Sequence, residues 1–126
     1  MRHASFLIVT AIVEGGAGVC LLLLPAIALE VLLGVSQAVP EATLVGRVAG
    51  AALLALGVAS WFGRNDLHSP AQRGLLTGLL IYNGTVAVLL VYAALGLSMA
   101  GIALWPAVGL HVSMAVWCVA CLRIKP

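Results

Sequence analysis

Four long apolar stretches divide the chain, and each is long enough to cross a lipid bilayer. They cover about residues 5–24, 40–62, 70–96 and 105–122. A spanning helix needs about 20 residues, so a chain of 126 residues has room for four spans and short connections. The sequence therefore predicts an all-α polytopic membrane protein: an antiparallel four-helix transmembrane bundle, with residues 1–126 forming a single membrane domain.

The composition excludes a water-soluble protein. Hydrophobic residues make up 63% of the chain and charged residues 8%, and the mean hydropathy is +1.20; a soluble domain is about half apolar and about a quarter charged. The net charge of +2 comes from scattered basic residues, so no nucleic-acid partner is expected. The three cysteines all lie in apolar segments and indicate no disulfide framework.

The first apolar stretch is interpreted as a retained span rather than a signal peptide, because its run from Ser5 to Leu24 is longer than a typical signal-peptide core. Pro25 then interrupts the helix. The following segment, about 26–34, has leucines on one side and Glu30 on another and ends at Gly34. This pattern predicts a short helix lying in the membrane interface.

Local signals mark where the later spans begin. Pro40 suits a first helical turn, and Glu41 beside it complements the helix dipole. Ser69, Pro70 and Gln72 form the pattern of a capping box with proline at the first helical position.

The basic residues predict the orientation. All that flank the spans lie on one side: Arg2, Arg64, Arg73, Arg123 and Lys125. The opposite links carry Glu30 and Glu41 and no Lys or Arg. The positive-inside rule then places both termini and the loop 63–71 in the cytoplasm.

Each predicted span carries one strongly polar residue in its interior: Glu14, Arg47, Asn83 and His111. By helix rise they lie roughly 13 to 23 Å from the cytoplasmic side, and a lone charge at such a depth costs about 2.5 to 3.5 kcal/mol on insertion scales. We therefore expect Glu14 and Arg47 to pair, with Asn83 and His111 as hydrogen-bonding members. With Tyr82 beside Asn83, the group is suited to binding a quinone ring or another small amphipathic molecule.

The same residues also fit a structural role, in which a buried ion pair fixes helix register and does nothing else. Ionisable groups within spans more generally mark pathways or binding sites. The ligand hypothesis depends on these side chains converging away from lipid.

Small residues predict where helices approach one another. Gly46 and Gly50 form a GxxxG pair, and so do Gly74 and Gly78. Both pairs are compatible with close helix contacts or with self-association.

Two further patterns, a pair of cysteines and three histidines, contain residues that can carry out redox chemistry or bind a metal. Cys118 and Cys121 form a CxxC that is compatible with a redox pair, but it falls at the cytoplasmic end of the last span and is more typical of packing. His3, His68 and His111 are too dispersed for a zinc site, so no metal is predicted, and His111 has no second candidate ligand for a haem.

Residues 46–61 (GRVAGAALLALGVASW) and 104–117 (LWPAVGLHVSMAVW) resemble segments of small bacterial four-helix membrane proteins similar in layout to the DoxX-like group. The resemblance implies a compact inner-membrane protein, in a group where some members are associated with quinone-linked sulfur oxidation or with maintaining redox proteins. It identifies no catalytic residue. The CxxC lies at the wrong end for a periplasmic thiol partner.

The sequence thus predicts a small accessory or ligand-binding membrane protein, not an enzyme by itself, whose cofactor is unknown, a quinone or another lipophile being compatible. The alternatives are a proton-linked small carrier, a quinone-linked redox component and a structural subunit of a larger complex. Small-residue faces favour a homo-oligomer or a partner subunit within the lipid bilayer.

Overall fold

The computed structural model describes residues 2–66 and 69–123, and within these ranges the chain is helical with no strand. Its helices are α1 (Arg2–Leu23), α2 (Pro25–Leu33), α3 (Pro40–Gly63), α4 (Pro70–Gly96) and α5 (Leu104–Leu122). Four of them, all except α2, are long and apolar enough to cross a membrane. The predicted all-α architecture of four spans, with a short helix after the first, is confirmed.

Proline residues and capping residues lie at the boundaries of the helices. Proline occupies the first turn of α2, α3 and α4, where its missing N–H removes no helical hydrogen bond. The Ser69 hydroxyl accepts a hydrogen bond of 3.0 Å from the Gln72 N–H and caps α4. Helix α2 ends at Gly34, whose φ of 75° lies in the left-handed region that glycine adopts without steric cost.

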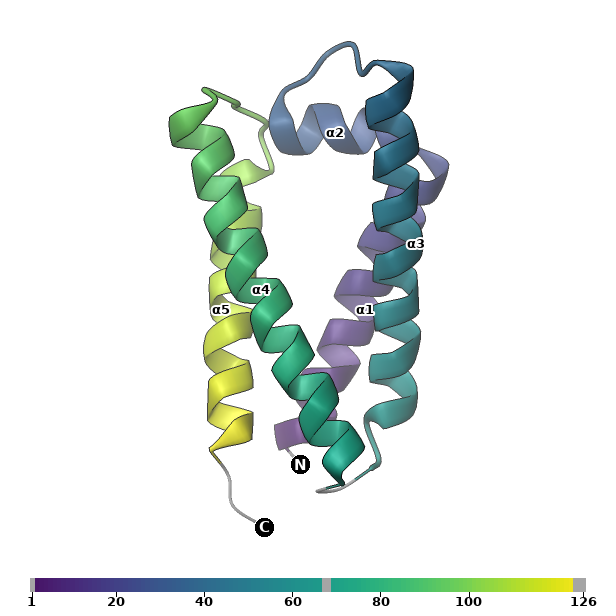
Figure 1. The fold of residues 1–126 in the computed structure, drawn as a ribbon, viewed down its shortest axis with the longest axis vertical. Coiled ribbons are helices and arrows are strands. Elements are labelled where there is room, and N and C mark those ends of the chain that lie inside the picture. The colour runs from purple at the N-terminus through teal and green to yellow at the C-terminus, as the bar shows by residue number, and fades with distance from the viewer. Residues whose placement is uncertain (1, 67–68, 124–126) are drawn as a thin grey trace.

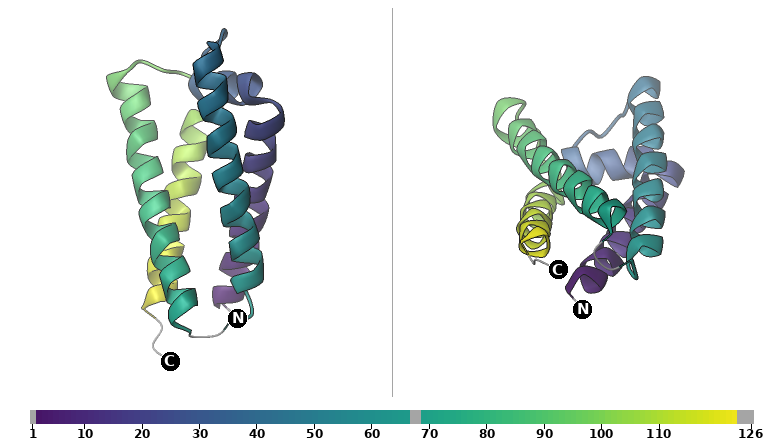
Figure 2. Two further views of the ribbon diagram at one scale, coloured as in Figure 1. Left: turned by 45° about the vertical axis from the view of Figure 1, so that its right-hand side comes forward. Right: turned by 60° about the horizontal axis from the view of Figure 1, so that its bottom comes forward.

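The four spans form two pairs, α1 with α3 and α4 with α5, and contacts between the pairs are sparse (Figure 1). The pairs lie closest at the end that carries both termini and diverge toward the other end, where α2 crosses between them (Figures 1 and 2). The bundle is therefore splayed at the end where α2 lies.

Glycines hold α1 and α3 together. A Cβ atom on Gly18 would lie 2.7 Å from the Gly50 carbonyl oxygen, and one on Gly57 would lie 2.9 Å from the Gly15 nitrogen. Only glycine allows backbones to approach this closely. The Gly46 and Gly50 pair thus serves a contact within the chain, whereas no described atom lies within 4 Å of a Cβ placed on Gly74 or Gly78.

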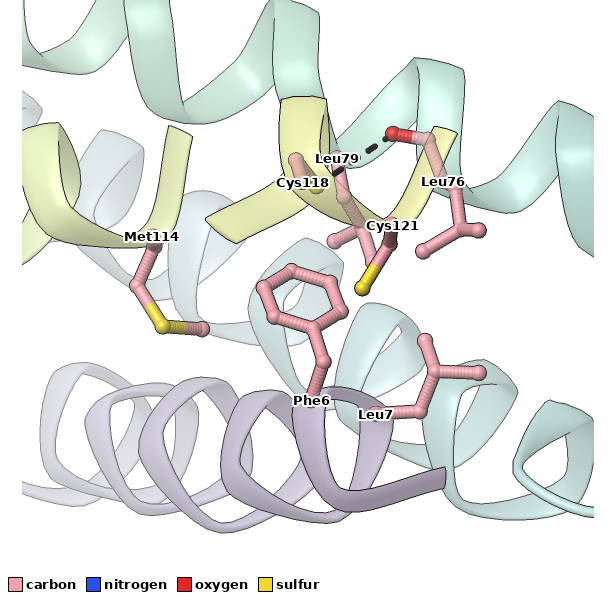
Figure 3. Close-up of a cluster of buried hydrophobic side chains, with 7 residues drawn as sticks. All are labelled: Phe6, Leu7, Leu76, Leu79, Met114, Cys118 and Cys121. Carbon is pink, nitrogen blue, oxygen red and sulfur yellow. Dashed lines mark hydrogen bonds between the residues drawn. The ribbon is translucent and has the colours of Figure 1, made fainter. Parts of the chain in front are cut away.

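A compact apolar core joins the two pairs at the end that carries the termini (Figure 3). Phe6 and Leu7 of α1 point toward α4 and α5, and Phe6 contacts Trp117 edge to face with 5.4 Å between ring centroids. The buried core comprises Phe6, Leu7, Leu76, Leu79, Met114, Cys118 and Cys121. This packing fixes the height at which polar side chains further along α1, α4 and α5 meet.

Most of the helix surface remains uncovered by the chain itself. Between 17% and 28% of residues in the most apolar part of each span are buried. Large apolar side chains such as Phe62, Leu95 and Ile102 are exposed. Surfaces of this kind are stable in contact with lipid or with other membrane helices.

Candidate functional site

Glu14 connects the two helix pairs. Its side chain, on α1, is only 2% exposed, and its Oε2 accepts a hydrogen bond of 3.1 Å from the Tyr82 hydroxyl of α4. A buried carboxyl is costly unless it is hydrogen-bonded or paired with a cation. Glu14 has this hydrogen bond but no ion pair with any residue that the structure describes.

Asn83 and His111 continue the arrangement onto α5. The Asn83 Nδ2 donates to the Leu79 carbonyl at 2.8 Å, while its Oδ1 lies 2.9 Å from His111 Nδ1. An amide oxygen only accepts, so His111 donates from Nδ1, and in the neutral ring Nε2 carries the lone pair. The Tyr82 and His111 rings meet edge to face, with centroids 5.6 Å apart.

These contacts define a polar cluster of four residues from three helices: Glu14, Tyr82, Asn83 and His111. Each lies about 17 to 20 Å along its helix from the end that carries the termini. This is near the middle of a hydrocarbon core about 30 Å thick. The structure therefore brings together four of the five residues predicted for the site.

Arg47 is the exception, and the predicted Glu14–Arg47 pair is wrong. Arg47 is exposed and makes no hydrogen bond or ion pair with the described residues. The reason lies in α3, which turns Gly46 and Gly50 toward α1 and α2. Arg47 follows Gly46 by about 100° of helical rotation, so the glycine seam leaves it on the outside.

The charged group of Arg47 can reach the membrane interface. It lies seven residues from Pro40, the first residue of α3, and so about 10 Å from that helix end. A long arginine side chain extends toward the interface from such a depth. Its charge therefore does not require a carboxylate from the same chain.

One oxygen of Glu14 has no partner in the part of the chain that the structure describes. Oε1 is buried and makes no hydrogen bond within residues 2–66 and 69–123, and the same is true of the Ser60 hydroxyl. Leaving a buried polar atom unpaired costs about 1 to 3 kcal/mol. Such atoms in native proteins often have a catalytic role, a bound water or an ion as their explanation.

An apolar groove begins one helical turn from Glu14. It has a volume of about 410 Å³ and lies between the second half of α1 and α2, with Ala103 closing it from the side of α5. Its lining includes Ala17 and Leu21 of α1, Leu24 between α1 and α2, and Ala28 of α2. Ala17 follows Glu14 by three residues and so projects from nearly the same face of α1.

The cysteines do not contribute to the polar cluster. Cys118 is buried, and its thiol donates to the Leu76 carbonyl with a sulfur–oxygen distance of 3.5 Å. Cys121 is buried in the same core, whereas Cys20 is exposed beside the apolar groove. Across the described part of the chain, no three His, Cys, Asp or Glu side chains are grouped so that they could hold a metal ion.

Sequence reasoning missed two features of the structure, a buried serine on α3 and the apolar groove. Ser60 is buried on the face of α3 that also carries Gly46, Gly50 and Gly57. Its position in this series of small residues could have predicted that it is buried against another helix. The apolar groove had no such signal, because its alanines and leucines are indistinguishable in sequence from those that face lipid.

Comparison with known proteins does not identify a family for this chain. No protein-family model, no curated protein sequence and no solved structure matches this chain.

Proposed function

We propose that this protein is a small ligand-binding protein of the bacterial inner membrane, and that the polar end of an amphipathic molecule binds at Glu14. The observation that supports this most directly is the buried Glu14 Oε1, which has no hydrogen-bond partner among the described residues, on the carboxyl whose Oε2 accepts from Tyr82. A ligand that hydrogen-bonds to this oxygen offsets the cost of leaving it unpaired. Arg47 is not part of the proposed site.

The available hydrogen-bonding groups favour a ligand head that carries a hydroxyl. Glu14 Oε1 accepts a hydrogen bond when the carboxyl is ionised, and His111 Nε2 accepts one when Nδ1 is the protonated nitrogen. The Tyr82 and His111 rings add aromatic surface next to these atoms. A phenol or a quinol ring combines a hydroxyl with a flat apolar face, and such rings pack well against aromatic side chains.

The proposed role is accessory. The carboxyl, phenol, amide and imidazole of the cluster hold the polar end of the ligand by hydrogen bonds. The DoxX-like resemblance and self-association stay predictions, and so does the orientation with both termini in the cytoplasm.

Binding of para-cresol, a phenol that has only a methyl group as its tail, tests the proposal. The protein is placed in lipid nanodiscs, and binding is measured by calorimetry with empty nanodiscs as the blank. We expect Glu14→Gln and His111→Ala to weaken binding by about tenfold, equivalent to about 1.4 kcal/mol. Glu30→Gln, which changes an exposed acid on α2, is the matched control.

The structural alternative gives a different result. If the cluster only fixes helix register, Glu14→Gln and His111→Ala reduce the thermal stability of the protein, and para-cresol gives no heat beyond the blank in any variant. Retained binding in both variants would also contradict a ligand site at Glu14.

A further inference from the structure

We infer that the ligand has a single apolar tail, which lies in the groove between α1 and α2 and extends from Glu14 toward the end of the bundle where α2 crosses. The inference rests on the proposed function and assigns a chemical class to the ligand. It predicts a binding site in two parts, a polar head site at Glu14 and an apolar tail site in the groove.

A single stripe of α1 connects the two parts. Thr10, Glu14, Ala17 and Leu21 follow one another at spacings of four, three and four residues, which places them along one face of the helix. Leu24 follows directly after the end of α1. Thr10 and Glu14 are buried, whereas Ala17, Leu21 and Leu24 line the groove. The change from buried face to groove lining lies between Glu14 and Ala17, and the two helix pairs diverge toward the end where α2 crosses (Figure 1).

The groove suits an apolar chain rather than water. Its lining consists of alanine, leucine, isoleucine, valine and Cys20, and a bound water needs two to four polar partners. Its volume of about 410 Å³ falls within the range of roughly 300 to 1,000 Å³ that is common for small-molecule sites. The part along α1, from Ala17 to the helix end at Leu23, is about 9 Å long.

A second apolar groove lies nearby, but it begins further from Glu14 than the first groove does, so a single tail in the first groove is proposed. The second groove has a volume of about 470 Å³, lies between α2 and α3, and shares Leu21 and Leu32 with the first groove. Its lining includes the carboxylic acid residue Glu41, and α1 contributes Leu21 to it. Leu21 is further along α1 from Glu14 than Ala17 is. A chain attached to a head at Glu14 therefore meets the first groove first, at Ala17.

The test compares two phenols that differ only in their tails, para-cresol and para-octylphenol, in lipid nanodiscs. The variant Ala28→Leu adds bulk to the first groove on α2, away from the polar cluster, and Ala49→Leu adds the same bulk to the second groove. We expect Ala28→Leu to weaken para-octylphenol binding by about tenfold, since overpacking at a filled site costs this much. Binding of para-cresol should change less than about twofold, and Ala49→Leu should affect neither probe.

Cys20 gives a second measurement that requires no substitution. Its exposed side chain lines the groove, so a bound octyl tail should slow its reaction with N-ethylmaleimide, whereas para-cresol should leave the rate unchanged. Equal effects of the two phenols on this rate would overturn the tail site. So would equal para-octylphenol affinities in Ala28→Leu and Ala49→Leu, or an absence of para-octylphenol binding. Glu14-independent binding of para-cresol would instead overturn the head site, so the two failures are distinguishable.

Discussion

The Tyr82 hydroxyl donates a hydrogen bond of 3.1 Å to Glu14 Oε2 and so links α4 to α1 between the two helix pairs. The apolar core joins the pairs only near the termini, at Phe6, Leu76 and Met114 among others. The Tyr82–Glu14 contact lies further along both helices from the end that carries the termini. We therefore expect this hydrogen bond to matter for the relative position of the pairs.

Tyr82→Phe removes the donor and leaves both Glu14 oxygens without a partner. The expected loss is about 1 kcal/mol in the free energy of unfolding, because a buried acceptor loses its hydrogen bond within the membrane. Tyr92→Phe is the matched control, since Tyr92 is 58% exposed. Unfolding by SDS titration in mixed micelles measures both, and equal stabilities of the two variants would show that the contact contributes nothing.

Arg47→Ala should leave stability unchanged within about 0.5 kcal/mol, since Arg47 is exposed and surface substitutions rarely exceed this value. Glu14→Ala should destabilise the protein, because Glu14 is 2% exposed and bonded to Tyr82. The same SDS titration compares them. Equal losses in the two variants, with no further loss in the double variant, would restore the ion pair that the sequence predicted.

Gly18→Ala should disrupt the α1–α3 seam. The new Cβ would lie 2.7 Å from the Gly50 carbonyl oxygen, and overpacking of this kind costs about 1 to 3 kcal/mol. Gly16→Ala serves as the control, because nothing described lies within 4 Å of its Cβ position. A Gly18→Ala protein as stable as Gly16→Ala would contradict close contact between the α1 and α3 backbones at Gly18 and Gly50.

N-ethylmaleimide should modify Cys20 well before the other two cysteines. Cys20 is exposed, whereas Cys118 and Cys121 are buried in the core (Figure 3). Mass spectrometry of the folded protein should find one modified site, and unfolding in SDS should release the others. Rapid modification of Cys118 in the folded protein would return the CxxC to consideration as a redox pair.

The architecture was predictable because the constraints that set it act locally. Apolar length identifies a span, and Pro25, Pro40 and Pro70 begin helices at the residues where the structure has them begin. The Ser69 cap follows from the same local chemistry. Such signals do not depend on which helices become neighbours.

The partner of Glu14 was not predictable in the same way. Pairing acid with base assumed that Arg47 faces the bundle interior, but close contact of Gly18 with Gly50 determines how α3 is rotated. Asn83 and His111 were correctly grouped because both are inward on helices that pack directly against each other. The rotation of a helix about its axis is a tertiary property, and charge patterning alone did not reveal it.

Infrared difference spectroscopy of para-cresol binding tests the central claim most directly. The spectrum of the protein in nanodiscs is recorded with and without the phenol, for the wild type, Glu14→Gln and Glu30→Gln. If the phenol hydroxyl bonds to Glu14, a carboxyl band shifts in the wild type and in Glu30→Gln and is missing from Glu14→Gln. Identical difference spectra in all three proteins would contradict a ligand site at Glu14.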